Sequence, residues 1–528
     1  MEKSLESYDK MPVRRAVMKN VLPAVAAMLM TLIYNLADTY FIGKTNDAYQ
    51  VAAVSLATPV FLIFMAVGTI FGAGGTSVIS RDFGEGKGDH AGKVGSFCLW
   101  NCLGLGTAIT VGMLLFMDPL LAVIGASEKA WDLTKEYLVI VSFSGPFALT
   151  SSCFSNVQRA EGQASRAMTG QIIGNLTNMC LDPLFISGFG WEIRGCALAT
   201  LIGETAGALY YLHYYIRGRS ILNVSIHNFT VRGHVFSGVF AIGVPAALGS
   251  LLMSVSQVIM NYKMAAYGDM AVAGIGVSMK VVMITGMISM GIGQGVQPLL
   301  GYCTGSGNRK RFRSYMKFAM ALATITGAVL TAVCYTLDDR IVSAFLSDRS
   351  AFDYALEFTR ILLSTGPLFG IFYVITNALQ AMGAAKASLI ANISRQGLVY
   401  IPMLFVLGSL FGVDGLVWSQ PVADVISFVT SLCMYAMVSR KKKFRCSCSP
   451  GSEPRCGDVP VRNAPSDTEF VSANVPGDTP VTQKCEHEKG DASPFGATPP
   501  CCFFATAVRP DQPVLPARLN ELETSAAG

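Results

Sequence analysis

Two acidic residues lie inside long apolar runs of the sequence, and they are the first candidates for chemistry. Asp38 follows Tyr34 by one helical turn in the run Leu-Ile-Tyr-Asn-Leu-Ala-Asp. Asp182 shares one helix face with Asn175 and Asn178, at spacings of i, i+3 and i+7. An acid inside a membrane span costs roughly 2.5 to 3.5 kcal/mol on insertion scales, so an acid that is retained there is a functional candidate.

The chemistry that these acids favour is the binding of a small cation. Amide oxygens beside a carboxylate suit a hard cation such as sodium, whereas a carboxyl group buried in a low dielectric gains affinity for a proton. Thr200 and Glu204, one turn apart, are placed to complete the site from a third helix. The sequence therefore predicts a proton or sodium site formed by Asp38, Asn178, Asp182, Thr200 and Glu204, with sodium held by the first three.

Each of these residues also has a purely structural interpretation. Asp38 is near enough to the end of its run to reach interfacial water, and the amides near Asp182 can hold helices together without an ion. Glu204 has an acidic counterpart, Asp424, in the second half of the chain, which suits a shared structural role. Lys280 lies inside an apolar run of that half and would repel a bound cation, so we expect ion coupling in the first half.

A second group of residues is expected to line a cavity for an amphipathic guest. Thioethers adapt to irregular surfaces and aromatic faces attract cations, so methionine and aromatic side chains suit guests of variable shape. Pro23 is a candidate hinge, because proline removes a helical hydrogen bond, although in a first helical turn it would have no such effect. The predicted cavity residues are Tyr34, Asn35, Asn175, Lys280, Met283, Met287 and Gln294.

The elements that position these residues are predicted to be membrane-spanning helices. Hydrophobic residues make up 52% of the 528 residues and charged residues only 14%, against roughly 25% charged residues in an ordinary soluble domain. Long unbroken apolar runs exclude a membrane barrel, which would show short alternating segments. We expect an all-α integral membrane protein with twelve spans, at 17–42, 51–79, 94–117, 136–158, 167–188, 194–216, 236–262, 270–300, 314–336, 355–382, 387–411 and 415–437.

The basic residues predict the orientation of the chain in a membrane. Alternate loops are rich in Lys and Arg, from Arg14 and Arg15 to the cluster that follows Arg440. By the positive-inside rule both termini are cytoplasmic, and we expect a multi-pass protein of the cell membrane. No removable signal peptide is indicated at the N-terminus. Eight of the 14 Cys, Cys196 among them, lie in or beside apolar runs, where a thiol behaves as a small hydrophobe.

An internal repeat divides the chain into two halves. Displaced by about 221 residues, Gly145-Pro146 falls on Gly366-Pro367. The repeat is parallel, because six spans return the chain to its starting side, and two such bundles can rock about a site near the midplane. The expected parts are a cytoplasmic segment at 1–16, a six-span half at 17–216, a cytoplasmic linker at 217–235, a six-span half at 236–437, and a cytoplasmic tail at 438–528 that is disordered by composition.

Several function classes are disfavoured by the sequence. A net charge of +5 is small for this length, and the basic residues lie between apolar runs, so nucleic-acid binding is not expected. The absence of a Walker motif argues against direct ATP drive. We find no convincing pair of nucleophile and base, and we expect neither an enzyme nor a bound cofactor.

These motifs resemble those of the multidrug and toxic compound extrusion (MATE) transporters over about residues 12–440. The resemblance implies two six-helix bundles that form a V-shaped central cavity, in which ion-linked bending of the first helix ejects a drug. It also implies that Asp38, Asn178, Asp182 and Thr200 match the family's ion site in the first half. The motifs that carry it are Pro23 and Asp38, Asn178 with Leu181-Asp182-Pro183, Arg159-Ala-Glu161-Gly162 in a cytoplasmic loop, and Gly145-Pro146 with its repeat.

We therefore expect a secondary active antiporter, a monomer, that exports organic cations or other amphipathic small molecules in exchange for protons or sodium ions. The alternative is a flippase for lipid-linked oligosaccharides of related architecture. Lys280 and Arg395 give that alternative some support, because a charge inside the membrane marks a substrate path.

Overall fold

The computed structural model describes residues 10–43, 48–124, 128–218, 220–343 and 349–441, and all regular elements within them are helices. The first half contains α2 (Val13–Gly43), α3 (Ala48–Gly84), α4 (Gly88–Leu115), α5 (Met117–Ile124), α6 (Glu128–Ser142), α7 (Gly145–Ala160), α8 (Ala164–Pro183), η1 (Leu184–Gly188) and α9 (Glu192–Ile216). After η2 (Ile226–Asn228), the second half contains α10 (Val235–Ala265), α11 (Asp269–Gly305), α12 (Arg309–Thr336), α13 (Asp338–Ser343), α14 (Arg349–Leu363), α15 (Gly366–Ala381), α16 (Ala385–Ile393), η3 (Ser394–Val399) and α17 (Tyr400–Lys441).

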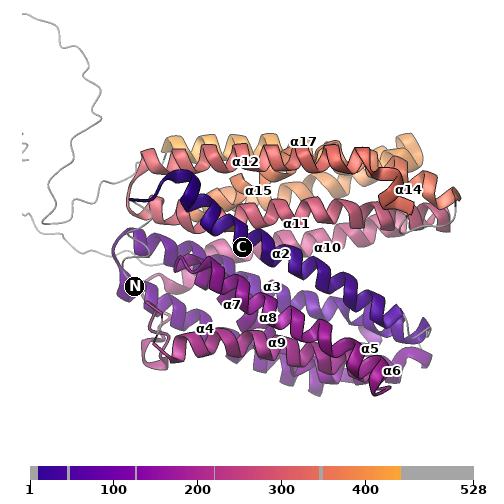
Figure 1. Ribbon diagram of the computed structural model, residues 1–528, viewed down its shortest axis with the longest axis horizontal. Helices are drawn as coiled ribbons and strands as arrows, with labels where there is room; N and C mark the ends of the chain where they lie inside the picture. The colour runs from indigo at the N-terminus through magenta and orange to yellow at the C-terminus, as the bar shows by residue number, and fades with distance from the viewer. Residues whose placement is uncertain (1–9, 44–47, 125–127, 219, 344–348, 442–528) are drawn as a thin grey trace, which may run out of the picture. The chain divides into compact units, whose positions relative to one another are not determined.

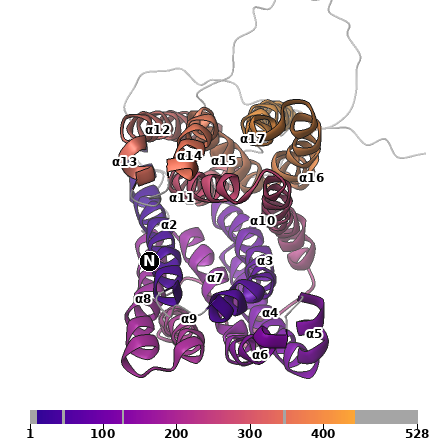
Figure 2. The ribbon, with the colours of Figure 1, turned by 90° about the vertical axis from the view of Figure 1, so that its right-hand side faces the viewer.

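The helices of the two halves follow the same order. The α3 helix begins at Ala48 and its counterpart α11 at Asp269, while α8 begins at Ala164 and α16 at Ala385, so that both pairs are displaced by about 221 residues. Figure 1 shows the two halves as two layers of helices, and Figure 2 shows α2 and α10 at opposite sides of their junction. The prediction of an all-α membrane fold built from two repeated six-helix halves is thus confirmed.

The helices accommodate the twelve predicted spans. Seven helical segments are long and apolar enough to cross a membrane, and two bent helix pairs raise the number to nine. One segment, Ala385–Arg440, covers two predicted spans, which meet at Gly412, where the backbone leaves helical geometry at φ 63° and ψ −133°. The α8 and α9 helices occupy the fifth and sixth predicted spans and are not among the nine, because both carry several polar side chains.

Two of the predicted spans are broken rather than continuous. The α6 and α7 helices meet at an angle of 53°, and their counterparts α14 and α15 meet at 48°. Gly145-Pro146 and Gly366-Pro367 begin α7 and α15. Proline has no N–H to donate to the preceding turn, so it fits the first turn of a new helix. The sequence motifs marked both sites, but the expectation of single spans at 136–158 and 355–382 needs this correction.

The first helix begins earlier than expected. The α2 helix starts at Val13 instead of residue 17 and continues to Gly43, with Pro23 inside it. Pro23 is therefore not a first-turn proline, and its ring interrupts the hydrogen-bond pattern in the interior of a helix. The linker expected at 217–235 follows α9 and leads into α10, whereas the end of the second half expected at residue 437 falls inside α17, which continues to Lys441. The tail expected at 438–528 falls outside the described residues beyond Lys441.

The two halves meet closely at the end of the molecule where α2 begins. A Cβ atom on Gly305 of α11 would overlap the carbonyl oxygen of Arg81 in α3, and one on Gly243 of α10 would overlap that of Ile70. In the same region the Ser77 hydroxyl donates to the carbonyl oxygen of Gln380, at 2.5 Å. Glycine has no Cβ and allows backbones to approach this closely. The halves are therefore closed against each other at this end.

Candidate functional site

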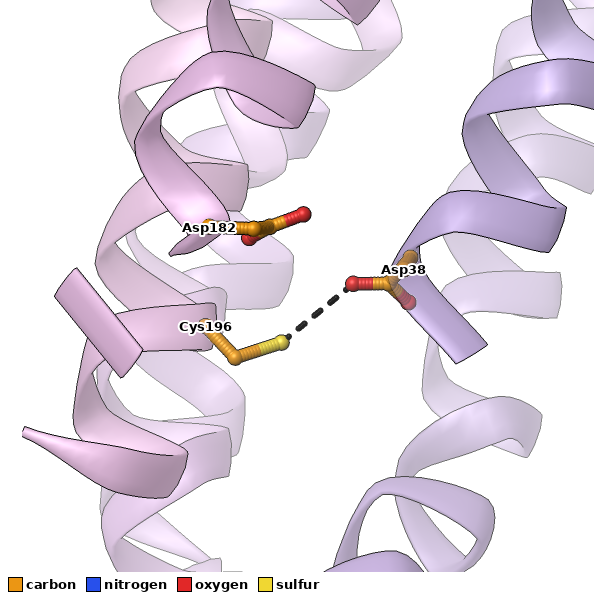
Figure 3. Close-up of side chains that lie close together, drawn as sticks. All are labelled: Asp38, Asp182 and Cys196. Carbon is orange, nitrogen blue, oxygen red and sulfur yellow. Dashed lines mark hydrogen bonds between the residues drawn. The ribbon is translucent and has the colours of Figure 1, made fainter. Parts of the chain in front are cut away.

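Three side chains from three helices of the first half converge on one point. Asp38 comes from α2, Asp182 from α8 and Cys196 from α9, and Figure 3 shows their side chains pointing toward one another. One ligand atom of each lies within 4.8 Å of the others. The Cys196 thiol donates to Asp38 Oδ1 at 3.4 Å. The two acids that lie far apart in the sequence thus form a single cluster.

Asp182 is a buried carboxylate without hydrogen-bond donors. Its side chain is fully buried, and neither of its oxygens has a hydrogen-bond partner among the described residues. Asn178, one helical turn earlier, donates to Thr200 Oγ1 at 3.2 Å, while its own Oδ1 also lacks a donor within the described part of the chain. Buried acceptors in native proteins are nearly always satisfied, so these oxygens are suited to a partner that the chain does not supply.

The arrangement of the cluster favours a bound positive charge. Two carboxylates this close in a medium of low dielectric do not both remain charged unless a cation or a shared proton compensates them. The oxygens of Asp38, Asp182 and Asn178 suit a hard cation such as sodium, whereas the sulfur of Cys196 is a soft ligand and does not. The donor set fits sodium, and the pair of carboxyl groups fits a proton equally well.

A small pocket adjoins the cluster. Its volume is about 30 Å³, which is room for one or two water molecules but not for a drug-sized guest. The pocket reaches Glu204, and the side chain of Ser151 is a hydrogen-bond partner of that acid. It lies between α2, α7, α8 and α9 and is lined by Tyr34, Ser151, Gln171, Gly174, Asn175, Asn178, Thr200, Gly203 and Glu204.

Hydrogen bonds between α2 and α8 hold the two acid-bearing helices together. The Thr31 hydroxyl oxygen on α2 accepts from Gln171 Nε2 and from Asn175 Nδ2, both at 3.3 Å. Asp38 lies two turns further along the same helix, and Asp182 lies two turns beyond Asn175. These contacts therefore fix the register in which the two carboxyl groups face each other.

The predicted cavity residues divide between the halves. Tyr34 and Asn175 line the small pocket, whereas Asn35 is exposed on α2. Met283 and Met287 are half-buried on α11 and are not among the residues that line this pocket. Their role in binding a guest stays a prediction.

Two polar residues of α11 have distinct surroundings. Lys280 is exposed in the first third of the helix. Gln294 lies further along and accepts a hydrogen bond from Arg159 Nη1 of α7, at 2.5 Å. Asn156 Oδ1 accepts from the same nitrogen at 3.2 Å. Gln294 therefore links the two halves, which the sequence did not predict.

Sequence reasoning also missed three members of the site. Cys196 was expected to act only as a small hydrophobe, and Ser151 and Gln171 were not singled out. A signal was present for Cys196, because it lies one helical turn before Thr200 and so shares its face. No such spacing identifies Ser151, which reaches the pocket from a different helix.

Glu161 is a further buried acid, outside the spans. It follows α7 in the turn to α8, as the resemblance implied, but only 1% of its surface is exposed. It accepts hydrogen bonds from the Tyr215 hydroxyl at 2.7 Å and from Ser220 Oγ at 2.9 Å. Burial raises the pKa of the Glu161 carboxyl to about 7, although these hydroxyl donors lower it. The contact ties the linker between the halves to the first half.

Comparison with known proteins identifies the family of this site and fold. The MatE family model matches the chain twice, at residues 23–184 and 245–406. The multidrug export protein MepA of Staphylococcus aureus (strain MRSA252) is 32% identical over 435 residues, which cover 82% of this chain and 95% of that protein. MepA of Staphylococcus haemolyticus (strain JCSC1435) is 31% identical over 444 residues, 83% of this chain and 97% of that protein.

A solved structure shows the same fold. It is described as an outward-facing conformation of a multidrug resistance MATE family transporter of the MOP superfamily. It is 22% identical to this chain, has a TM-score of 0.76, and the match covers 81% of this chain and 97% of the solved one. The chain therefore belongs to the MATE family and is a multi-pass membrane transporter, as its motifs predicted.

Proposed function

We propose that this protein is a secondary active antiporter that exports organic cations and other amphipathic small molecules in exchange for protons or sodium ions. The observation that carries the proposal is the facing pair Asp38 and Asp182. The two acids lie on different helices, and Asp182 has no hydrogen-bond donor among the residues that the structure describes. The family membership and the MepA relatives support multidrug export. The open carboxyl pair supports coupling to a small cation.

The closed end of the molecule faces the cytoplasm in this proposal. The α2 helix begins at that end, beside Arg14 and Arg15, and α12 begins there with Arg309, Lys310 and Arg311. Basic residues concentrate on the cytoplasmic side of membrane proteins. With the halves closed at this end, the described conformation is one that releases its guest outward.

Coupling between the ion and the guest passes through α2. This helix contacts the first half through Thr31, and it contacts the second half where Gly291 and Gly295 of α11 meet Val25 and Val21. An ion that neutralises Asp38 and Asp182 removes their mutual repulsion and lets α2 draw toward α8. Pro23 lies between the first residue of α2 and Asp38 and supplies the bend. Movement of α2 then changes the surface that the two halves present to the guest.

Transport by the purified protein in proteoliposomes tests this function. Export of a fluorescent organic cation is measured with a proton gradient and a sodium gradient imposed separately, for the native chain and for Asp182→Asn. We expect one of the two gradients to drive export, and the variant to lose that response while it still folds. Export that is indifferent to both gradients and to Asp182 would contradict ion-coupled antiport.

The flippase alternative loses one of its two supports. It rested on the charges of Lys280 and Arg395 inside apolar runs. The Arg395 guanidinium is 5% exposed and is paired with Asp424, at 2.8 Å, so it does not present a free charge to a passing substrate. The MepA relatives are multidrug export proteins by name, which supports the antiporter instead.

A further inference from the structure

The second half contains a buried ion pair in the position that corresponds to the small pocket of the first half. Gly174 and Arg395 are related by the displacement of about 221 residues that also relates α8 to α16. Glu204 and Asp424 are related by nearly the same displacement. Gly174 and Glu204 line the pocket. The repeat therefore replaces a pocket-lining glycine by arginine and keeps the acid.

Both oxygens of the Asp424 carboxylate accept hydrogen bonds from its surroundings. Its Oδ1 accepts from Arg395 Nε at 2.8 Å and from Gln420 Nε2 at 3.0 Å, and its Oδ2 accepts from the Thr365 hydroxyl at 3.2 Å. The side chains of Arg395 and Asp424 are 6% and 4% exposed. A buried pair is retained at little cost only when further hydrogen bonds satisfy its atoms, and here Gln420 and Thr365 supply two of them to the carboxylate.

Aromatic rings surround the guanidinium of Arg395. Its Cζ lies 3.9 Å from the ring centroid of Phe369, 5.3 Å from that of Phe372 and 5.7 Å from that of Tyr373. A carboxylate with aromatic faces around it is the kind of site that proteins use to bind free organic cations. Here the cation that fills it is part of the chain.

The two halves therefore differ in what occupies the equivalent position. In the first half Gly174 is one of the residues that line the water-sized pocket, and the nearby Asp182 has no donor within the described residues. In the second half the helix positions that correspond to Asp38 and Cys196 hold Met260 and Leu416, which are buried in an apolar cluster. The acid of this half, Asp424, accepts hydrogen bonds on both of its oxygens, unlike Asp182.

We infer that Arg395 is a tethered cation that permanently occupies the second half's counterpart of the first-half pocket. The site that Arg395 fills is specific for a planar guanidinium, because Asp424 and the aromatic rings contact the planar group of Arg395. The charge at this position of the second half is thereby fixed, and ions exchange only in the first half. This last consequence rests on the proposed function, whereas the occupancy of the site by Arg395 does not.

Removing the tether tests the inference without any transport measurement. The variant Arg395→Gly copies the glycine of the first half and leaves Asp424 facing an empty site. We expect its melting temperature in detergent to fall, and guanidinium chloride at low millimolar concentration to restore it in a concentration-dependent way. Sodium and tetramethylammonium chlorides serve as comparison salts, because the site holds a planar cation.

Control variants separate a specific site from a general salt effect. Arg194→Gly removes the arginine of a solvent-accessible ion pair with Glu136, and guanidinium should not restore the melting temperature of this variant. In the double variant Arg395→Gly, Asp424→Asn, guanidinium should not restore the melting temperature, because the carboxylate that binds guanidinium is absent. The inference would be overturned if guanidinium raised the melting temperature of all variants equally, or if it did not raise that of Arg395→Gly.

A second variant covers the case in which Arg395→Gly does not fold. Arg395→Gln keeps an amide that can donate toward Asp424. Guanidinium must then raise the melting temperature of Arg395→Gln more than it raises that of the double variant Arg395→Gln, Asp424→Asn. No difference between these two would also contradict the tethered cation. Because no export is measured, a failed export assay bears only on the proposed function.

Discussion

The buried acids of this protein differ in whether the chain satisfies their oxygens. Asp424 accepts three hydrogen bonds, one of them from Arg395, whose charge also balances its own. Asp182 has none among the described residues, although it is fully buried. A buried charge that lacks partners is costly unless something else compensates it. The unsatisfied acid is therefore the one to test for function.

Asp38 and Asp182 should behave as one unit in mutational tests. We expect Asp38→Asn and Asp182→Asn each to lower gradient-driven export by about 5- to 150-fold, the usual span of coupling free energies between two sites. The double variant should lose little more than either single one, because both changes disrupt the same site. Export rates of the three variants in proteoliposomes check this expectation.

Asp118→Asn is the matched control for these variants, since Asp118 is an exposed acid on α5 paired with Lys135. It should export at the native rate. Losses of the single variants that multiply in the double variant would show two independent acids instead of one site.

Glu161 makes the stability of the folded protein depend on pH. Its pKa is raised from 4.5 to about 7 by burial, so the folded protein binds more protons than the unfolded chain between these values. The contribution of Glu161 to the stability is then fully present below about pH 4.5 and is lost as pH rises to about 7, by about 3 kcal/mol. We expect Glu161→Gln, which stays neutral, to flatten this part of the melting-temperature profile between pH 5 and 8.

The comparison that isolates Glu161 uses another acid at the same end of the molecule. Glu85→Gln changes an exposed acid that pairs with Lys87, and it should keep the native pH profile. If Glu161→Gln and the native protein lose stability equally as pH rises, burial of this carboxyl is not what sets the slope.

At the scale of helices, glycine contacts set how closely the halves approach. Four helices meet at the closed end, where α3 packs on α10 and α11, and α2 packs on α11. The contacts there are between backbones, and any side chain would separate them. These helices also connect the acid cluster to the second half through α2. In the proposed mechanism, closure and ion binding are linked through this packing, which tolerates little change in volume.

Gly305→Val should prevent full closure of the halves. A Cβ at this position would overlap the carbonyl oxygen of Arg81, so α3 and α11 must move apart. We expect a longer distance between spin labels on the last turns of these two helices, and export reduced about tenfold or more. Gly276→Val on the same helix, where a Cβ meets open space, should change neither quantity. An unchanged distance in Gly305→Val would contradict the tight contact.

Pro23→Ala should separate the hinge from stability. Alanine restores a helical hydrogen bond, so the variant should be more stable, by up to about 3 kcal/mol. Export should nevertheless fall, because α2 loses its preferred point of bending. Pro59→Ala, which removes a proline from the interior of α3, is the control and should keep export. Native export by Pro23→Ala would exclude Pro23 as the hinge.

At the scale of the whole molecule, the duplicated halves have diverged in what they place between equivalent helices. The first half keeps open oxygens and a water-sized pocket, and the second half fills the corresponding position with Arg395 and Asp424. Transport by this architecture needs the two halves to move against each other. In the proposed function, the first half changes its charge and the second half is internally neutralised, which suits a single ion-dependent step in each cycle.

The transporter function should reside in the two halves. The family match ends at residue 406 and the described helices end at Lys441. We expect a chain cut after Pro454 to keep the melting temperature and the export rate of the full chain, within the scatter of about 0.5 kcal/mol for changes remote from the core. Loss of export with an unchanged melting temperature would instead assign a transport role to the residues after Pro454.

The sequence by itself determined the class of the protein, its halves and its principal acids. Apolar runs long enough to span a bilayer leave helices as the only way to satisfy the backbone, which is why the spans were predictable. Asp38, Asp182, Asn178 and Thr200 were predictable because polar residues in such runs are costly and few. The bends at Gly145-Pro146 and Gly366-Pro367 were marked by motifs but not predicted as bends.

Only the tertiary structure decided which residues meet across helices. Cys196 beside Asp38, Gln294 beside Arg159 and Arg395 beside Asp424 are pairs separated by many residues, and spacing along one helix carries no information about them. From the sequence, Arg395 was interpreted as a charge on a substrate path, whereas the structure shows that Asp424 neutralises it. Packing between helices depends on the shapes of both surfaces at once, and this is why it appears only in the folded protein.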